Sequence, residues 1–162
     1  MKLKSSNKII TPLVAAEKMR NWCAYQERSQ NEARQKIYEF KLEPETAESI
    51  LIELINENFI NEERFAMAFA SGKFRIKHWG RIKIKMGLRQ HKVSDYCIKK
   101  ALQNIDDVEY EKTLIRVIEK KLNLTKGGDS KKKFYTVSNH VISKGFESDL
   151  VLEQLKLLLG SF

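Results

Sequence analysis

One pattern of apolar residues occurs three times along the 162-residue chain. It is first found between Leu42 and Leu54, returns 51 residues later, and returns again after a further 53 residues. The equivalent positions are Leu42, Ala47, Ile50, Leu51 and Leu54; Val93, Ile98, Ala101, Leu102 and Ile105; and Phe146, Val151, Gln154, Leu155 and Leu158. Only Gln154 departs from the apolar character. Repetition at this period indicates stacked supersecondary units, each too small to bury its apolar face alone.

Start and stop signals divide each repeat into three short helices. Pro12 and Pro44 each open a helix, because a proline in the first turn gives up an N–H that has no helical partner there. Ser29 with Glu32 forms a capping box, and Asn61 is a suitable N-cap for a later helix. The predicted helices span residues 12–28, 30–41, 44–57, 62–75, 79–91, 95–104, 107–122, 130–143 and 148–159.

The chain is therefore predicted to be all-α, with three tandem three-helix repeats. We place repeat 1 at 11–58, repeat 2 at 59–106 and repeat 3 at 107–162. Residues 1–10 are basic and polar and are predicted to form a disordered N-terminal tail.

The stretch GRIKIKMGLRQHKVS, which begins at Gly80, alternates charged and apolar side chains like a half-buried strand. The repeat register indicates a helix instead. It aligns Ile84 and Leu88 with apolar helical positions in the other two copies; the equivalent sets are Ala33, Ile84 and Val137, and Ile37, Leu88 and Val141. Ile82 and Met86 lie off this apolar stripe, and we expect them to contact a neighbouring helix.

Positive charge is concentrated in repeat 2. The whole chain carries a net charge of +9, and residues 73–100 hold ten Lys or Arg against Asp95 alone. Residues 41–63, in contrast, hold seven Glu against one Lys. Such polarisation is typical of a protein with a polyanionic or acidic partner, although a basic face that is merely solvated is the alternative. The candidate binding residues are Arg75, Lys77, Arg81, Lys83, Lys85, Arg89 and Lys92.

Four of these candidates are predicted to share one exposed helical stripe, because they recur at spacings of four, four and three residues. They are Arg81, Lys85, Arg89 and Lys92. The stripe suits the phosphates of single- or double-stranded DNA and an acidic protein surface equally well. Phe74 and Trp79 could stack on bases in this region, but packing between helices is the interpretation we favour.

The sequence holds no constellation that points to catalysis or to a metal. Cys23 and Cys97 lie far apart without a second cysteine or histidine at ligand spacing, so we expect buried, reduced thiols. His91 falls on an apolar stripe, and neither His78 nor His140 has an evident catalytic partner. We therefore predict a protein that is not an enzyme and needs no cofactor or metal.

The chain shows no sign of export. No apolar run approaches the ~18 residues that a membrane-spanning helix needs. The N-terminus lacks the apolar centre of a signal peptide. We expect a cytoplasmic monomer without a membrane partner.

The second repeat carries a family resemblance. The segment LINENFINEERFA runs from Leu54, at the end of the first repeat, into the second, and is followed by GRIKIKMGL and then KVS. Similar features, an acidic pair before Phe-Ala and a Gly-x-x-[Arg/Lys]-[Ile/Leu] helix start, are typical of the RecX family, the bacterial regulatory proteins of the RecA recombinase. Here Asn61-Glu62 replaces the acidic pair, and Lys92 stands in a turn where the family commonly has glycine. The resemblance extends over about residues 11–159, with a looser match in repeat 3.

The resemblance implies three repeats in an elongated, curved arrangement. It also implies binding along RecA–DNA filaments, with suppression of strand exchange, ATP hydrolysis and co-protease activity. Two other functions stay open. The units could act as a stand-alone nucleic-acid-binding protein of the helix-turn-helix kind, although few side chains beyond Arg89 and Gln90 suit base readout. The second is that of a structural adaptor, which would use the acidic and leucine-rich faces of the chain.

Overall fold

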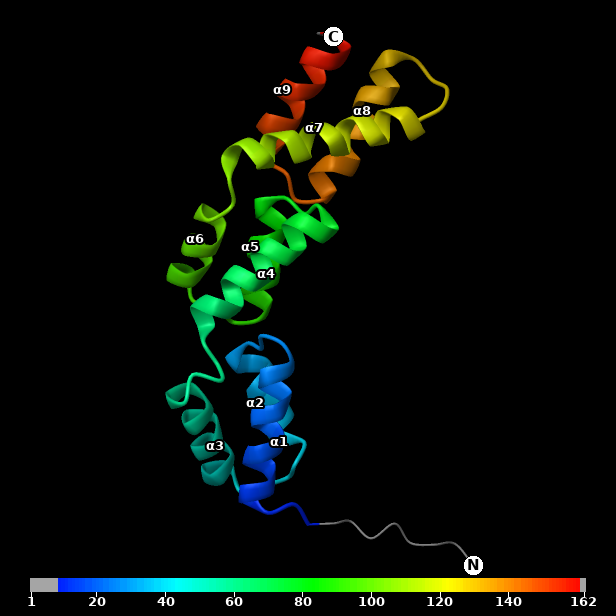
Figure 1. The fold of residues 1–162 in the computed structure, drawn as a ribbon. Coiled ribbons are helices and arrows are strands. Elements are labelled where there is room, and N and C mark those ends of the chain that lie inside the picture. The colour runs from blue at the N-terminus through cyan, green and yellow to red at the C-terminus, as the bar shows by residue number, and fades with distance from the viewer. Residues whose placement is uncertain (1–8, 161–162) are drawn as a thin grey trace, which may run out of the picture. The chain divides into compact units, whose positions relative to one another are not determined.

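The structure, a computed structural model, describes residues 9–160, and all regular structure in that range is helical (Figure 1). The predicted all-α fold is confirmed. The helices are α1 (Pro12–Tyr25), α2 (Gln30–Tyr38), α3 (Pro44–Asn56), α4 (Glu62–Lys77), α5 (Arg81–Gln90), α6 (Asp95–Gln103), α7 (Asp107–Leu124), α8 (Ser130–Ser143) and α9 (Ser148–Leu159). Most of the predicted tail at 1–10 lies outside the described residues.

The chain divides into two compact units, Met1–Phe65 and Ala66–Phe162. The first holds α1 to α3 and the start of α4, and the second holds the rest of α4 and α5 to α9. The finer division into three repeats, with boundaries near residues 58 and 106, stays a prediction.

Helices α1, α2 and α3 pack around one apolar core in the first unit. Large side chains that are almost fully buried in this core include Met19, Ile37 and Leu54. The predicted start signals are confirmed, because Pro12 and Pro44 open α1 and α3 and the capping box of Ser29 and Glu32 opens α2. The predicted ends of α1 and α2 were too late by three residues each. The backbone is already extended at Gln26 (φ −156°, ψ 161°) and turns to positive φ at Lys41.

Cys23 is a buried, free thiol in this core. Burial is the main reason that its pKa is raised to about 11. Since the thiolate is the reactive form, we expect Cys23 in a Cys97→Ala variant to react with a disulfide reagent at pH 8 about 100-fold more slowly in the folded protein than in urea. Similar rates in the two states would contradict this burial.

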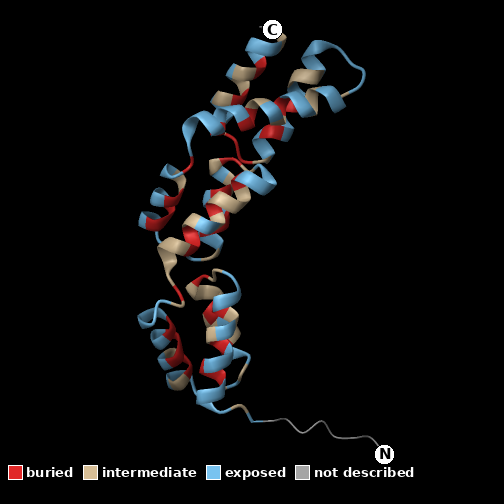
Figure 2. Ribbon diagram, viewed as in Figure 1, coloured by how far each residue is buried: buried red, intermediate tan, exposed pale blue. Residues whose placement is uncertain are grey.

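The repeat register is confirmed by the pattern of burial, which recurs at intervals along the helices (Figure 2). The six positions aligned with the basic stretch are all buried: Ala33, Ile37, Ile84, Leu88, Val137 and Val141. Four other positions of the repeat are not buried, because Leu42, Leu102 and Gln154 are half-buried and Leu158 in the last turn of α9 is exposed. Gln154, the polar departure, donates a hydrogen bond to Glu111 at 3.3 Å.

The basic stretch of repeat 2 forms helix α5, as the register predicts. Gly87 of α5 packs closely against α4, since a Cβ added to Gly87 would lie 2.7 Å from the ring of Phe69. The expectation for Ile82 and Met86 was wrong. They are 48% and 56% exposed, since they lie on the side of α5 opposite the buried Ile84.

A backbone contact in the second unit joins the start of α5 to the turn between α8 and α9. The N–H of Gly80 donates to the carbonyl of Lys144 at 2.9 Å, and that of Ile82 donates to the carbonyl of Gly145 at 3.0 Å. A Cβ on Gly80 would overlap the Gly145 carbonyl group, and one on Gly145 would overlap Lys83. We call this contact the glycine joint, because neither position has room for a side chain.

Tyr110, near the start of α7, packs beside the glycine joint. Its ring stacks on Phe74 with centroids 5.7 Å apart and contacts Phe146 at 5.3 Å. Its hydroxyl donates to Glu147 Oε2 at 2.6 Å and accepts from the N–H of Arg81 at 3.0 Å. Burial and the carboxylate of Glu147 both raise the pKa of Tyr110, so the hydroxyl stays protonated and can donate this bond.

No helix within residues 9–160 is long and apolar enough to cross a membrane.

Candidate functional site

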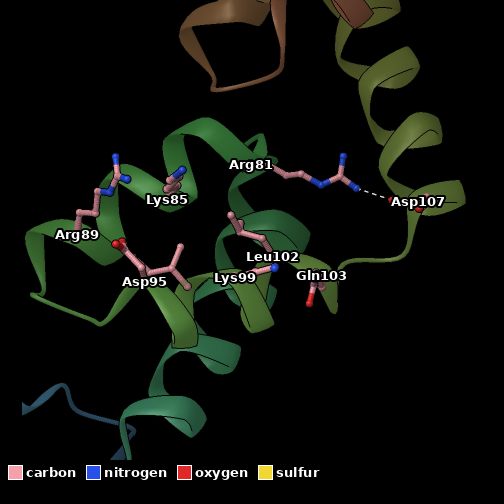
Figure 3. A pocket seen from close by; sticks show the side chains of 9 residues that line it. Arg81, Lys85, Arg89, Asp95, Lys99, Leu102, Gln103 and Asp107 are labelled. Atoms are coloured by element: carbon pink, nitrogen blue, oxygen red, sulfur yellow. Dashed lines mark hydrogen bonds and ion pairs between the residues drawn. The ribbon is translucent and has the colours of Figure 1, made fainter.

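A groove of about 600 Å³ lies between α5, α6 and the start of α7 (Figure 3). Its lining combines cations, two acidic residues and an apolar floor. The lining residues are Arg81, Lys85, Arg89, Asp95, Ile98, Lys99, Leu102, Gln103 and Asp107. All of them belong to the second unit.

Helix geometry places the cations of the groove. Arg81, Lys85 and Arg89 recur every four residues, so they follow one side of α5 while Ile84 and Leu88 face the core. Helix α6 begins at the Ser94 cap, whose hydroxyl accepts from the N–H of Cys97 at 3.4 Å. This helix supplies the floor through Ile98 and Leu102, and it adds a further cation, Lys99.

Arg81 is held by the protein itself, in contrast to the expectation that it faces outward with the other cations. Its guanidinium pairs with Asp107 at 2.6 Å and lies 3.7 Å from Glu147. It also lies 3.8 Å from the centroid of the Tyr110 ring. Its side chain is 24% exposed, whereas Lys85 and Arg89 are exposed. The outward-facing cations of the predicted stripe are therefore Lys85 and Arg89.

The other sequence candidates lie outside the groove. Arg75 lines a separate cavity of about 320 Å³ together with Asp106, Glu109 and Arg116. Lys92 follows the end of α5 at a positive φ of 57°, so the helical spacing that placed it on the stripe no longer applies. Lys77 ends α4 and Lys83 lies on another side of α5, where its ammonium is 4.6 Å from the centroid of the Trp79 ring.

The two aromatic candidates pack against other helices. Phe74 is buried against Tyr110, which rules out stacking on a base without unfolding of this contact. Trp79 is half-buried, with its ring in edge contact with Phe69 at a centroid distance of 6.4 Å.

Sequence reasoning missed Lys99, Asp95 and Asp107 as parts of the groove. Lys99 directly follows the buried Ile98 in α6. Its helical position, next to the buried face, could have placed it beside the basic stripe. Asp107 had no such signal, because its side chain reaches Arg81 across 26 residues of sequence.

The side chains that line the groove can bind a partner, but they do not form a recognisable set of catalytic residues. Two arginines and two lysines supply N–H donors, and the floor of Ile98 and Leu102 supplies apolar contact. Among the described residues 9–160, no three His, Cys, Asp or Glu gather in a way that could hold a metal ion. The groove therefore offers both charged groups and apolar surface to a partner.

Known proteins are similar to this chain in sequence and in fold. Regulatory protein RecX of Prosthecochloris aestuarii (strain DSM 271 / SK 413) is 30% identical over 135 residues, which cover 82% of this chain and 85% of that protein. The chain belongs to the RecX family. The family model for RecX, second three-helix domain, matches residues 61–102, which include both α5 and the predicted basic stripe.

Other RecX proteins differ in length. Regulatory protein RecX of Clostridium perfringens (strain 13 / Type A) is 31% identical over 126 residues, or 75% of this chain. The match covers 58% of that protein, so the chain spans little more than half of its length. A crystal structure of RecX from Lactobacillus salivarius has a TM-score of 0.81 at 20% identity and covers 91% of this chain and 96% of its own. This structural likeness supports the helical fold.

Proposed function

We propose that the chain regulates the RecA recombinase by binding the RecA–DNA filament through the α5–α6 groove. The observation that carries this proposal is the groove itself, in which Lys85 and Arg89 are exposed beside an apolar floor. Family membership supports a regulatory role, since the relatives are named as regulatory proteins, and the resemblance to the RecX family implies RecA as the partner. Occupation of this groove by the filament accounts for suppressed strand exchange, ATP hydrolysis and co-protease activity without a catalytic step or a cofactor.

The protein acts, in this proposal, as a cytoplasmic monomer that recognises the assembled filament. Its contact surface joins cations to apolar side chains, so it suits a partner with both negative charge and protein-like surface. Naked DNA offers the charge alone. The chain should therefore prefer RecA-coated single-stranded DNA over naked DNA, whereas a stand-alone nucleic-acid-binding protein would bind both alike.

Reversing the two exposed cations tests the proposed contact. The Lys85→Glu/Arg89→Glu variant should raise the concentration that half-inhibits RecA ATP hydrolysis on single-stranded DNA by at least about 10-fold, because each reversal places an unpaired charge against the partner. Arg81 is left intact, since its replacement would break contacts within the fold.

The matched control reverses two exposed lysines elsewhere, Lys18→Glu/Lys126→Glu, and changes the net charge by the same amount. It should inhibit within about 2-fold of the parent protein, as expected for charges outside an interface. Full inhibition by a folded Lys85→Glu/Arg89→Glu variant would remove the groove from the proposed contact.

A further inference from the structure

A second group of cations surrounds Trp79, on residues that do not line the α5–α6 groove. Lys73 on α4 and Lys83 on α5 place their ammonium groups 4.9 Å and 4.6 Å from the centroid of the Trp79 ring. Lys144 comes from the α8–α9 turn, next to Gly145, where an added Cβ would overlap Lys83. We call Lys73, Trp79, Lys83 and Lys144 the Trp79 cluster.

The glycine joint holds this cluster together. Two backbone hydrogen bonds connect the residues next to Trp79 and Lys83 to the turn that carries Lys144. The ammonium of Lys144 also donates to the carbonyl of Lys77 at 3.2 Å. Because Lys77 ends α4, this bond places the positive charge at the negative end of the helix dipole. The end of α4 and the start of α5 are thus held against the distant α8–α9 turn within the second unit.

The cluster has no internal counter-charge. Within residues 9–160, no carboxylate forms an ion pair with Lys73, Lys83 or Lys144. The pKa of Lys144 is lowered, first by burial and then by the positive charges of Lys83 and Lys120. Like charges held this close repel one another, and an external anion would relieve the repulsion.

The composition of the cluster distinguishes it from the groove. The groove includes Asp95 and Asp107, which would repel a phosphate chain, and it offers an apolar floor. The Trp79 cluster instead combines lysines with an aromatic ring, and lysine is a point-charge donor well suited to phosphate. Lysines beside an aromatic ring are also the combination with which proteins follow a nucleic-acid strand.

We propose that the Trp79 cluster binds the phosphate backbone of a nucleic acid, at a site separate from the groove. The proposal extends the proposed function but does not depend on RecA, because the cluster would hold naked DNA as well. Binding draws the ammonium groups of Lys73 and Lys83 toward phosphate and away from the ring, so the fluorescence of Trp79 should report it.

The experiment uses the full chain without RecA. A Trp22→Phe background leaves Trp79 as the remaining one of the chain's two tryptophans. An oligothymidylate of about 16 nucleotides, and a duplex of similar length, are titrated while the emission of Trp79 is followed. We expect a saturable change in emission with the oligonucleotide, and a slope of log affinity against log salt that counts the contacted phosphates.

Removing the three charges should abolish most of this response. In the Lys73→Ala/Lys83→Ala/Lys144→Ala variant, the Kd for oligothymidylate should rise at least about 10-fold, and the salt slope should fall by about 2. The matched control, Lys18→Ala/Lys126→Ala/Lys156→Ala, loses the same charge from exposed positions and should keep both values nearly unchanged. Circular dichroism verifies the fold, and the corresponding triple Lys→Gln variant replaces the alanine variant if that one does not fold.

The outcomes separate clearly. An unchanged Kd and salt slope in the folded triple variant would overturn the site, as would Trp79 emission that does not respond to saturating DNA. A stronger response to polyglutamate than to either nucleic acid would assign the cluster to an acidic protein and overturn the proposal as well. A response to duplex but not to the single strand, lost in the triple variant, supports the site and identifies its form of DNA. Since RecA is absent, none of these results bears on inhibition through the groove.

Discussion

Replacing Tyr110 by alanine should lower the free energy of unfolding of the second unit by about 3 to 5 kcal/mol, the range for truncation of a large buried aromatic side chain. The change removes the ring that packs between Phe74 and Phe146. It also removes the hydroxyl that bonds Glu147 and the N–H of Arg81. Urea unfolding, followed by Trp79 fluorescence in the Trp22→Phe background, measures this effect in the second unit.

Two further variants separate packing from hydrogen bonding at this position. Tyr110→Phe keeps the ring and should cost about 1 to 2 kcal/mol, because a part-buried carboxylate and a backbone N–H lose their partner. Tyr96, an exposed tyrosine on α6, serves as the control, and Tyr96→Ala should change stability by less than about 0.5 kcal/mol. If Tyr110→Ala were as mild as Tyr96→Ala, the packing described around Tyr110 would be wrong.

Replacing Gly145 by alanine should destabilise the second unit by about 3 to 5 kcal/mol, for two additive reasons. The residue has a φ of 97°, a conformation that costs an L-amino acid about 1 to 2 kcal/mol. The new methyl group would also overlap Lys83 and force the two sides of the glycine joint apart. The same fluorescence-detected urea unfolding measures the loss.

Gly127 provides the control for backbone strain alone. Its φ of 76° is also positive, but a Cβ there would meet nothing within 4 Å. Gly127→Ala should therefore cost only about 1 to 2 kcal/mol. The difference in unfolding free energy between the two variants measures the cost of the steric overlap at the glycine joint. Equal losses would mean that α5 and the α8–α9 turn are not in contact.

Local signals in the sequence predicted the helices well. Capping residues such as Ser29 and Ser94 act within three residues of themselves, so their effect can be read without the fold. The apolar repeat predicted the core because equivalent residues occupy equivalent places in each copy. Helix ends were less predictable, since they depend on backbone angles such as the positive φ of Lys41.

The candidate site was predicted only in part, because its details depend on contacts between distant residues. The helical spacing correctly grouped Lys85 with Arg89. No residue near Arg81 in sequence indicates that it pairs with Asp107 and Glu147. The sequence predicted that Ile82 contacts a neighbouring helix, but its side chain is about half exposed. Two members of the Trp79 cluster, Lys83 and Trp79, were candidates from the sequence. Lys144 was not, because it joins the cluster from the distant α8–α9 turn.

The N-terminus of α5 has a consequence for how this chain folds during synthesis. Gly80 provides no side-chain cap, and the first N–H groups of the helix bond instead to Tyr110 Oη and the Gly145 carbonyl. A ribosome that has released α5 and α6 has not yet made these acceptors, so the helix waits for partners up to 63 residues downstream of Ile82. The start of α5 therefore gains these partners only after the α8–α9 turn is made, and we expect a nascent chain stopped before α8 to hold a frayed α5.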